Sequence, residues 1–153
     1  MVRLSDLPEP VANFYQNMAM PEFGPTPWAA PPDLKGARIA LISTAGLHRR
    51  DDPKFAPGAS DYRIIPGDVD YAEIVMSHVS VNFDRRGFQQ DVNIAFPLEH
   101  LRTLAEAGEI GSVAQWHYSF MGATDPPRFE ETGGQVAKLL QDDGVDAALL
   151  IPI

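Results

Sequence analysis

Two segments of the chain carry apolar residues at consecutive positions. Residues 38–44 read Arg-Ile-Ala-Leu-Ile-Ser-Thr, and residues 145–153 read Val-Asp-Ala-Ala-Leu-Leu-Ile-Pro-Ile. Continuous apolar runs of this kind are typical of parallel strands that are covered on both faces. Two further strands are predicted over residues 113–121 and 62–66, whereas residues 71–76 are compatible with a short helix or a strand. A polar loop is predicted over residues 47–61, between the strand at 38–44 and the strand at 62–66.

Helical signals lie between these strands. Pro97 precedes apolar residues spaced three and four apart, and Gly108 stands where a left-handed cap ends a helix. A second helix is predicted over residues 127–143, with a side-chain cap from the Thr-Asp-Pro-Pro segment at 124–127 and Gly144 at its end. This order of elements predicts a single layered α/β domain, in which helices flank a mostly parallel sheet.

The N-terminal part of the chain has a different composition. Residues 1–35 are predicted to form a short helix over residues 10–18 and a proline-rich N-terminal arm, and residues 36–153 form the α/β domain. Half of the 14 prolines fall in the first of these segments, and proline neither continues a helix nor donates to a sheet. The arm carries Phe23 and Trp28, whose rings we expect to pack on the same or a sister subunit. We therefore predict a homodimer.

Composition narrows the function classes. The chain has 21 acidic and 12 basic residues and a formal charge of −9, which argues against a nucleic-acid-binding protein. It has no cysteine, which excludes disulfides, zinc–thiolate sites, iron–sulfur clusters and a thiol nucleophile within these residues. No apolar run is long enough to cross a bilayer, and the first residues lack the pattern of a secretory signal. We therefore predict a cytoplasmic protein that does not contact a membrane.

A crevice for a ligand is predicted at the carboxyl end of the sheet. Small residues at positions 44–46, Thr-Ala-Gly, follow the first strand, and open α/β sheets bind ligands at this edge. His48 follows the same turn, and His117 lies in a strand that runs toward the same edge. His78 opens a dense polar segment over residues 77–93. Such a segment is either a hydrated loop or an organised network.

These side chains suggest two kinds of chemistry. His78 or His117 would act as a general acid or base near neutral pH. Alternatively, two histidines with Asp84 or Asp91 would bind a divalent metal, although the spacing matches no standard ligand motif. Whether a metal or another cofactor is needed therefore stays open. The dinucleotide, P-loop and hydrolase-elbow motifs are absent from the sequence.

The adjacent arginines of the polar segment suggest the charge of the ligand. Arg85 and Arg86 carry planar, permanently charged guanidinium groups of the kind that bind carboxylates. In a chain this acidic, they would create a local positive site by focusing their field. A small anionic substrate fits such a site.

Four separate blocks of the sequence resemble a known family. The blocks are Arg-Ile-Ala-Leu-Ile-Ser-Thr-Ala-Gly-Leu-His (38–48), Ser-His-Val-Ser-Val-Asn-Phe-Asp-Arg-Arg-Gly-Phe-Gln-Gln-Asp-Val-Asn (77–93), His-Tyr-Ser-Phe-Met-Gly (117–122) and Gly-Val-Asp-Ala (144–147). Together they resemble the selenoprotein B family of the glycine, sarcosine, betaine and D-proline reductases. The resemblance implies a substrate pocket formed by the residues that lie in matching blocks: His48, His78, Asp84, Arg85, Arg86, Gln90, Asn93 and His117.

The resemblance also implies a reaction class. In that family a selenocysteine or cysteine beyond the last strand attacks the substrate, and a pyruvoyl-containing partner subunit holds the amine. The present sequence stops at Ile153, where that motif is expected to begin, and lacks cysteine. Either the thiol or selenol comes from another polypeptide, or the fold has been reused for chemistry that needs no thiol.

The leading hypothesis is thus a reductase-family protein that binds a small amino-acid-like or carboxylate compound for cleavage of a carbon–heteroatom bond. Arg85 or Arg86 would bind the anion, His78 and His117 would move protons, and Asp84 would orient a histidine. Two alternatives stay open. The first is a non-redox hydrolase or lyase, with or without a metal, that uses histidine and aspartate. The second is a non-catalytic subunit that pairs with a catalytic chain.

Overall fold

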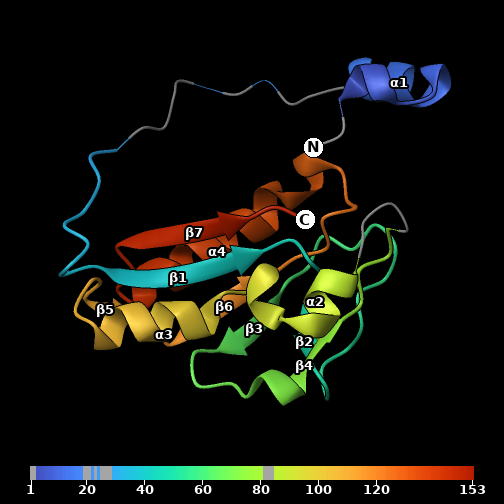
Figure 1. Cartoon of the computed structure of the whole chain (residues 1–153). Coiled ribbons are helices and arrows are strands. Elements are labelled where there is room, and N and C mark those ends of the chain that lie inside the picture. The colour runs from blue at the N-terminus through green and yellow to red at the C-terminus, as the bar shows by residue number, and fades with distance from the viewer. Residues whose placement is uncertain (1–2, 19–21, 23, 25–28, 81–84) are drawn as a thin grey trace.

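A computed structural model of the chain describes residues 3–18, 22, 24, 29–80 and 85–153. One five-stranded sheet forms the centre of the molecule, and a helix layer covers each of its faces (Figure 1). The predicted α/β domain with a mostly parallel sheet is confirmed. Phe23 and Trp28 of the predicted arm lie outside the described residues.

Strand β1 is the centre of the sheet. β7 pairs with one of its edges, β5 and β6 pair with successive parts of the other, and β3 lies outside β6. All of these pairs are parallel except β3 with β6. β2 and β4 form a separate antiparallel pair. The bounds are β1 (Arg38–Ser43), β2 (Leu47–Arg49), β3 (Arg63–Pro66), β4 (Ile74–Met76), β5 (Ser112–Val113), β6 (Trp116–Ser119) and β7 (Ala147–Ile151).

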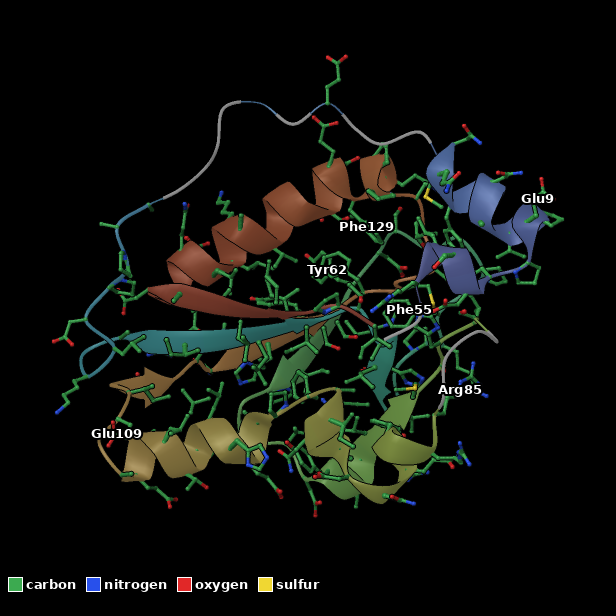
Figure 2. All side chains as sticks on the ribbon, turned by 45° about the horizontal axis from the view of Figure 1, so that its top comes forward. Glu9, Phe55, Tyr62, Arg85, Glu109 and Phe129 are labelled. Carbon is green, nitrogen blue, oxygen red and sulfur yellow. The ribbon has the colours of Figure 1, made fainter. Side chains whose placement is uncertain are left out.

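Two helices sandwich the sheet. α3 and α4 lie on opposite faces, and α1 lies toward the end of the sheet where the C-terminus is found (Figures 1 and 2). Short 3-10 turns cover residues 4–6, 71–73, 92–94 and 126–129. The helices are α1 (Glu9–Gln16), α2 (Arg86–Gln90), α3 (Leu98–Glu106) and α4 (Glu130–Asp142).

The burial of β1 explains its continuous apolar run. Leu41 packs in the cluster on the α3 face with Leu98 and Leu101. Ile42 packs on the α4 face, where Tyr118 and Val136 are buried. Figure 2 shows this second layer between the sheet and α4. Because successive side chains point to opposite faces, a strand covered on both sides needs apolar residues at every position.

Three predicted elements differ in detail. The predicted loop after the first strand contains β2, because Leu47 and His48 are buried and pair with β4. Residues 71–76 combine both alternatives, a 3-10 turn followed by β4. The predicted side-chain cap at 124–127 is absent: the Thr124 hydroxyl donates instead to the Ala59 carbonyl at 2.8 Å, and the N-cap residue, Asp125, makes no side-chain cap bond.

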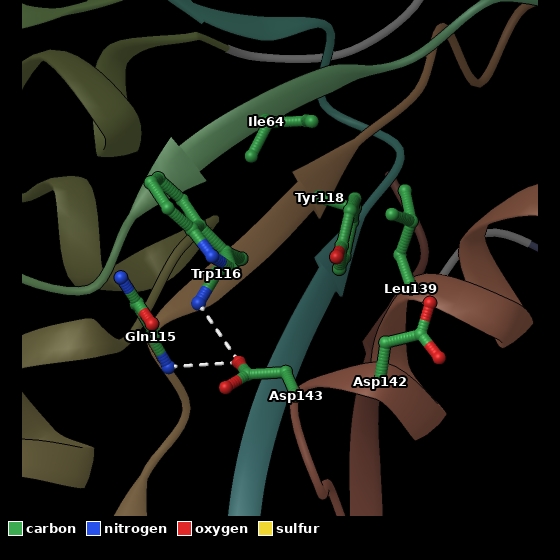
Figure 3. A pocket seen from close by; sticks show the side chains of 7 residues that line it. All are labelled: Ile64, Gln115, Trp116, Tyr118, Leu139, Asp142 and Asp143. Carbon is green, nitrogen blue, oxygen red and sulfur yellow. Dashed lines mark hydrogen bonds between the residues drawn. The ribbon is translucent and has the colours of Figure 1, made fainter.

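The predicted strand over 113–121 is divided into β5 and β6 by a contact from α4. The Asp143 carboxylate accepts hydrogen bonds from the backbone N–H groups of Gln115 at 2.9 Å and Trp116 at 3.2 Å (Figure 3). It also forms a salt bridge with Arg38 at the start of β1. Asp143 thus joins α4 to two strands beside a cavity of about 290 Å³, whose lining includes Trp116 and Tyr118.

Two adjacent glycines in α4 lead to a prediction about the stability of the protein. A Cβ at Gly133 or Gly134 would meet no heavy atom within 4 Å, so no close contact requires glycine there. Because glycine in a helix costs about 1 kcal/mol relative to alanine, Gly134→Ala should raise the free energy of unfolding by about that amount. Urea denaturation measures the change, and Ala137→Gly on the same exposed side should lower it similarly. No gain in Gly134→Ala would contradict this assignment.

Candidate active site at the carboxyl end of the sheet

Three strands of the sheet end at one place. Thr44 follows β1, Gly122 follows β6, and Ile153 follows β7. The Thr44 hydroxyl accepts a hydrogen bond from the Ile153 N–H at 2.8 Å and lies 3.2 Å from the Ile153 carbonyl oxygen. The Gly122 N–H donates to the Thr44 carbonyl at 2.8 Å. The carboxyl edge predicted from residues 44–46 is therefore a tightly bonded junction.

Glycine is required at two positions of this junction. A Cβ on Gly122 would lie 2.4 Å from the Ile153 carbonyl oxygen and 2.9 Å from that of Thr44. Gly46 has a φ of +65°, and a Cβ there would lie 3.0 Å from the backbone nitrogen of His78. Because both contacts are with backbone, side chains at these positions would force the strand ends and the His78 segment apart.

A cavity of about 480 Å³ opens at this junction. One wall is the junction itself, with Gly122 and Ile153, and a second is the segment that carries His78 and Ser80. Helix α1 contributes apolar side chains, and the loop after β6 contributes polar ones. The remaining lining residues are Phe14, Tyr15, Met18, Ala123, Thr124, Asp125 and Pro126.

His78 is the predicted site residue that lines this cavity. Its side chain is held by the fold, because only 5% of the residue is exposed and its Nδ1 accepts a hydrogen bond from the Ser80 N–H at 3.1 Å. That bond places the proton of the neutral ring on Nε2. Burial lowers the pKa of His78, and the nearby charge of Arg85 lowers it further. At neutral pH the ring is uncharged, and its Nε2–H is a hydrogen-bond donor.

Arg85 fixes the backbone of the same segment. Its guanidinium group donates to the carbonyl oxygens of His78 and Ser80, the second at 2.7 Å. Arginine can bridge two acceptors in this way because its donors form a rigid planar fork. The guanidinium that was predicted to bind a substrate anion therefore makes contacts that position His78.

His48 contacts Ser77, the first residue of the segment that carries His78. The ring is 1% exposed, and its two nitrogens lie 2.7 Å from the Arg49 carbonyl oxygen and 2.7 Å from the Ser77 hydroxyl. Because a carbonyl only accepts, Nδ1 carries the proton and Nε2 accepts from Ser77. His48 thus anchors the start of the His78 segment to β2.

His117 is part of the core. It is 0% exposed, its Nδ1 accepts from the Leu41 N–H at 2.9 Å, and its ring packs edge-on against Phe96. Burial, with a smaller effect from Arg102, lowers its pKa to about 4. Its Nε2 has no hydrogen-bond partner within the described part of the chain. The structure does not bring this ring to the surface of a cavity with His78.

The other predicted residues lie around α2. Arg86 and Gln90 are exposed at its two ends. The Asn93 side chain accepts a hydrogen bond from the Tyr71 hydroxyl at 2.8 Å and donates one to the Glu99 carboxylate at 3.1 Å. These bonds link the 3-10 turn at residues 71–73 to α3. Asp84 lies outside the described residues.

Sequence reasoning did not assign several residues that line the cavity. Ser80 and Thr124 are polar, and Tyr15 comes from a helix that no pattern connected to the sheet. Gly122 could have been assigned to the cavity from the sequence. It is a small residue directly after a predicted strand, like the small residues at 44–46. Among the described residues, no group of three or more histidine, aspartate or glutamate side chains is arranged to hold a metal ion.

The arrangement is that of an α/β protein with a cavity at the carboxyl edge of its parallel sheet, which is the edge where open α/β sheets bind their ligands. Residues 10–152 match the family model described as glycine/sarcosine/betaine reductase selenoprotein B, and the chain belongs to this family. The resemblance of the four sequence blocks is thereby confirmed. No helix in the described part of the chain has the length and apolar character needed to span a membrane.

Curated relatives share this membership. The chain is 38% identical over 121 residues to the D-proline reductase subunit gamma of Acetoanaerobium sticklandii, a match that covers 77% of the chain and 49% of the relative. It is 29% identical over 143 residues to the betaine reductase complex component B subunit beta of Peptoclostridium acidaminophilum, covering 90% and 33%. The glycine reductase complex component B subunit gamma of Carboxydothermus hydrogenoformans is 27% identical over 144 residues, again covering 90% and 33%. The chain thus spans half or less of these relatives' lengths. No solved structure gives a significant match.

Proposed function

We propose that the cavity beside His78 binds a small amino-acid-like compound with a carboxylate, whose carbon–heteroatom bond is cleaved in a reductase complex. The observation that carries this proposal is the position of His78, which is buried at the junction of three strand ends and faces a cavity of about 480 Å³. The names of the relatives support the reaction class, since each is a component or subunit of a reductase for D-proline, betaine or glycine.

His78 is the hydrogen-bond donor to the bound compound in this proposal. Its lowered pKa leaves the ring neutral at neutral pH, so its Nε2–H donates a hydrogen bond to the bound compound and stabilises negative charge there. Arg85 is a positioning residue, because it holds the carbonyl groups on both sides of the histidine segment. We retain Arg86 as the partner of the substrate carboxylate and Asp84 as an orienting group, whereas His117 supports the core.

The electrons come from outside these 153 residues. Reductive cleavage of a carbon–nitrogen bond consumes two electrons and two protons and yields a C–H and an N–H bond. The chain has no cysteine to donate them. We therefore propose that a partner subunit with a thiol, selenol or pyruvoyl group works at the same cavity. The relatives' descriptions as subunits support a complex of this kind.

Purification of the complex from its own cells, through a tag on this chain, tests the proposal. The complex is assayed with D-proline, glycine, sarcosine and betaine in the presence of a dithiol reductant, and loss of each substrate is measured. His78→Gln should lower kcat/KM by roughly 10²- to 10³-fold for the substrate that is used, because the positioned Nε2–H donor is lost. His100→Gln on α3 is the matched control, because that histidine is exposed.

Two outcomes would contradict the proposal. Equal activity of His78→Gln and the unchanged complex would remove His78 from the reaction. Cleavage by the 153-residue chain alone, without reductant or partner, would favour a non-redox hydrolase or lyase.

A further inference from the structure

β7 has a free edge in the described sheet. It pairs with β1 through five residue pairs from Ile39↔Ala147 to Ser43↔Ile151. Within the described ranges, no strand pairs with its other side, so β7 is an edge strand of the sheet, as are β3 and the two-residue β5. Figure 1 shows β7 at the outer side of β1.

The side chains of β7 are exposed on both faces. Leu149 is 45% exposed and Leu150 is 66% exposed. Paired residues point to the same face, so Leu149 shares the α3 face with Leu41, and Leu150 shares the α4 face with Ile42. A strand with apolar residues on both faces normally lies inside a parallel sheet, where helices cover it.

Each face of the sheet carries an apolar groove, and the groove on the α3 face borders β7. On the α4 face, a groove of about 240 Å³ is lined by residues that include Ile42, Phe120 and Val136. On the α3 face, a groove of about 270 Å³ is lined by residues that include Leu101 and Leu149. We give the name β7 surface to the exposed side chains of β7 together with the groove on the α3 face.

The five residues of β7 lack the charged side chains and proline that protect exposed edges, although Asp146 and Pro152 flank the strand. Natural edge strands carry charged residues or proline, which prevent another strand from pairing. β3, at the opposite edge, has Arg63 at its start and Pro66 at its end. The five residues of β7 are all alanine, leucine or isoleucine. β7 therefore has the composition of a strand that is paired on both sides.

We propose that the β7 surface is the docking site for a parallel strand, with its covering helices, from the part of the family polypeptide that this chain does not match. The 121 matched residues are 49% of the D-proline reductase subunit gamma, so about as many residues lie outside the match. A strand with a crossover helix needs only about 30 residues. A second copy fits less well, because each chain carries a formal charge of −9. This inference rests on family membership and is independent of the chemistry at His78.

Hydrogen exchange on the native protein tests the proposal. The protein is tagged at its N-terminus in its own cells, and its exchange is compared with that of the recombinant 153-residue chain. The peptide over residues 145–153 should exchange at least tenfold more slowly in the native preparation. That preparation should also contain polypeptide related to the unmatched half of subunit gamma. Peptides from β1 should exchange slowly in both preparations, and this slow exchange verifies that both are folded.

Matched variants of β7 and β3 complete the test in the native protein. Leu150→Lys should raise the exchange of the 145–153 peptide to the rate of the recombinant chain. Ile64→Lys should leave it slow, because Ile64 is 41% exposed on the opposite edge strand. A native preparation made only of this chain would overturn the proposal, whether β7 exchanges fast in a monomer or is protected in a dimer. Equal exchange in Leu150→Lys and the unchanged native protein would also overturn it.

Discussion

Asp143→Ala is expected to lower the free energy of unfolding by about 2–3 kcal/mol, because it removes one partner of a part-buried ion pair and the acceptor of two backbone N–H groups. The Asp143 side chain is only 7% exposed, and it pairs with Arg38 while accepting two backbone hydrogen bonds. Its loss leaves a guanidinium group and two N–H groups without their acceptor at the start of β1 and β6.

Urea denaturation of three variants separates the contributions at this position. Asp143→Asn should lower the free energy of unfolding by less than Asp143→Ala does. Its amide oxygen still accepts hydrogen bonds from the backbone, although the charge is removed. Asp142→Ala is the matched control: its side chain is exposed one residue earlier, and we expect a change within about 0.5 kcal/mol. A loss below about 1 kcal/mol in Asp143→Ala would show that this carboxylate does not hold the sheet to α4.

The second large effect is a dependence of stability on pH that originates at His117. Burial lowers the pKa of this histidine from 6.5 to about 4, so the unfolded chain binds the proton more strongly than the folded one. Stability is therefore lost as the pH falls from about 6.5 toward 4, and the loss from this residue reaches about 3 kcal/mol below that range. Above pH 6.5 both states are neutral and the effect disappears.

Comparison of His117→Gln with the unchanged chain isolates this contribution. Glutamine does not titrate, and its carbonyl oxygen is a suitable acceptor for the Leu41 N–H. We expect the variant to be less stable at pH 7.5 but to lose about 3 kcal/mol less between pH 7.5 and 4. His100→Gln, on an exposed histidine, should leave the pH dependence unchanged. Parallel pH curves for His117→Gln and the unchanged chain would refute the assignment.

The sequence predicted those elements whose signals are local. Residues 38–44 and 145–153 form paired parallel strands, because an unbroken apolar run requires cover on both faces. Gly108 and Gly144 mark the ends of α3 and α4 with φ values of +70° and +65°. The division between β5 and β6 was not predictable, since the carboxylate that causes it comes from a residue 28 positions away in the sequence.

The sequence predicted only part of the candidate site, because some contacts in the site join residues that are far apart in the chain. The small residues at 44–46 identified the carboxyl edge, and His78 lines the cavity found there. Residue type did not distinguish His78 from His117, because a buried histidine can face a cavity or the core. Only the tertiary structure shows that His117 accepts from Leu41 and is fully buried. The role of Arg85 in holding backbone carbonyls also depends on the folded loop.

A crystal structure of the native complex with bound substrate, taken from the compound that the activity panel identifies, tests the central claim most directly. The account predicts the compound in the cavity at the junction of β1, β6 and β7, within hydrogen-bond distance of His78 Nε2. Density for the compound in the cavity beside Asp143 and Trp116, or on the partner subunit alone, would contradict it.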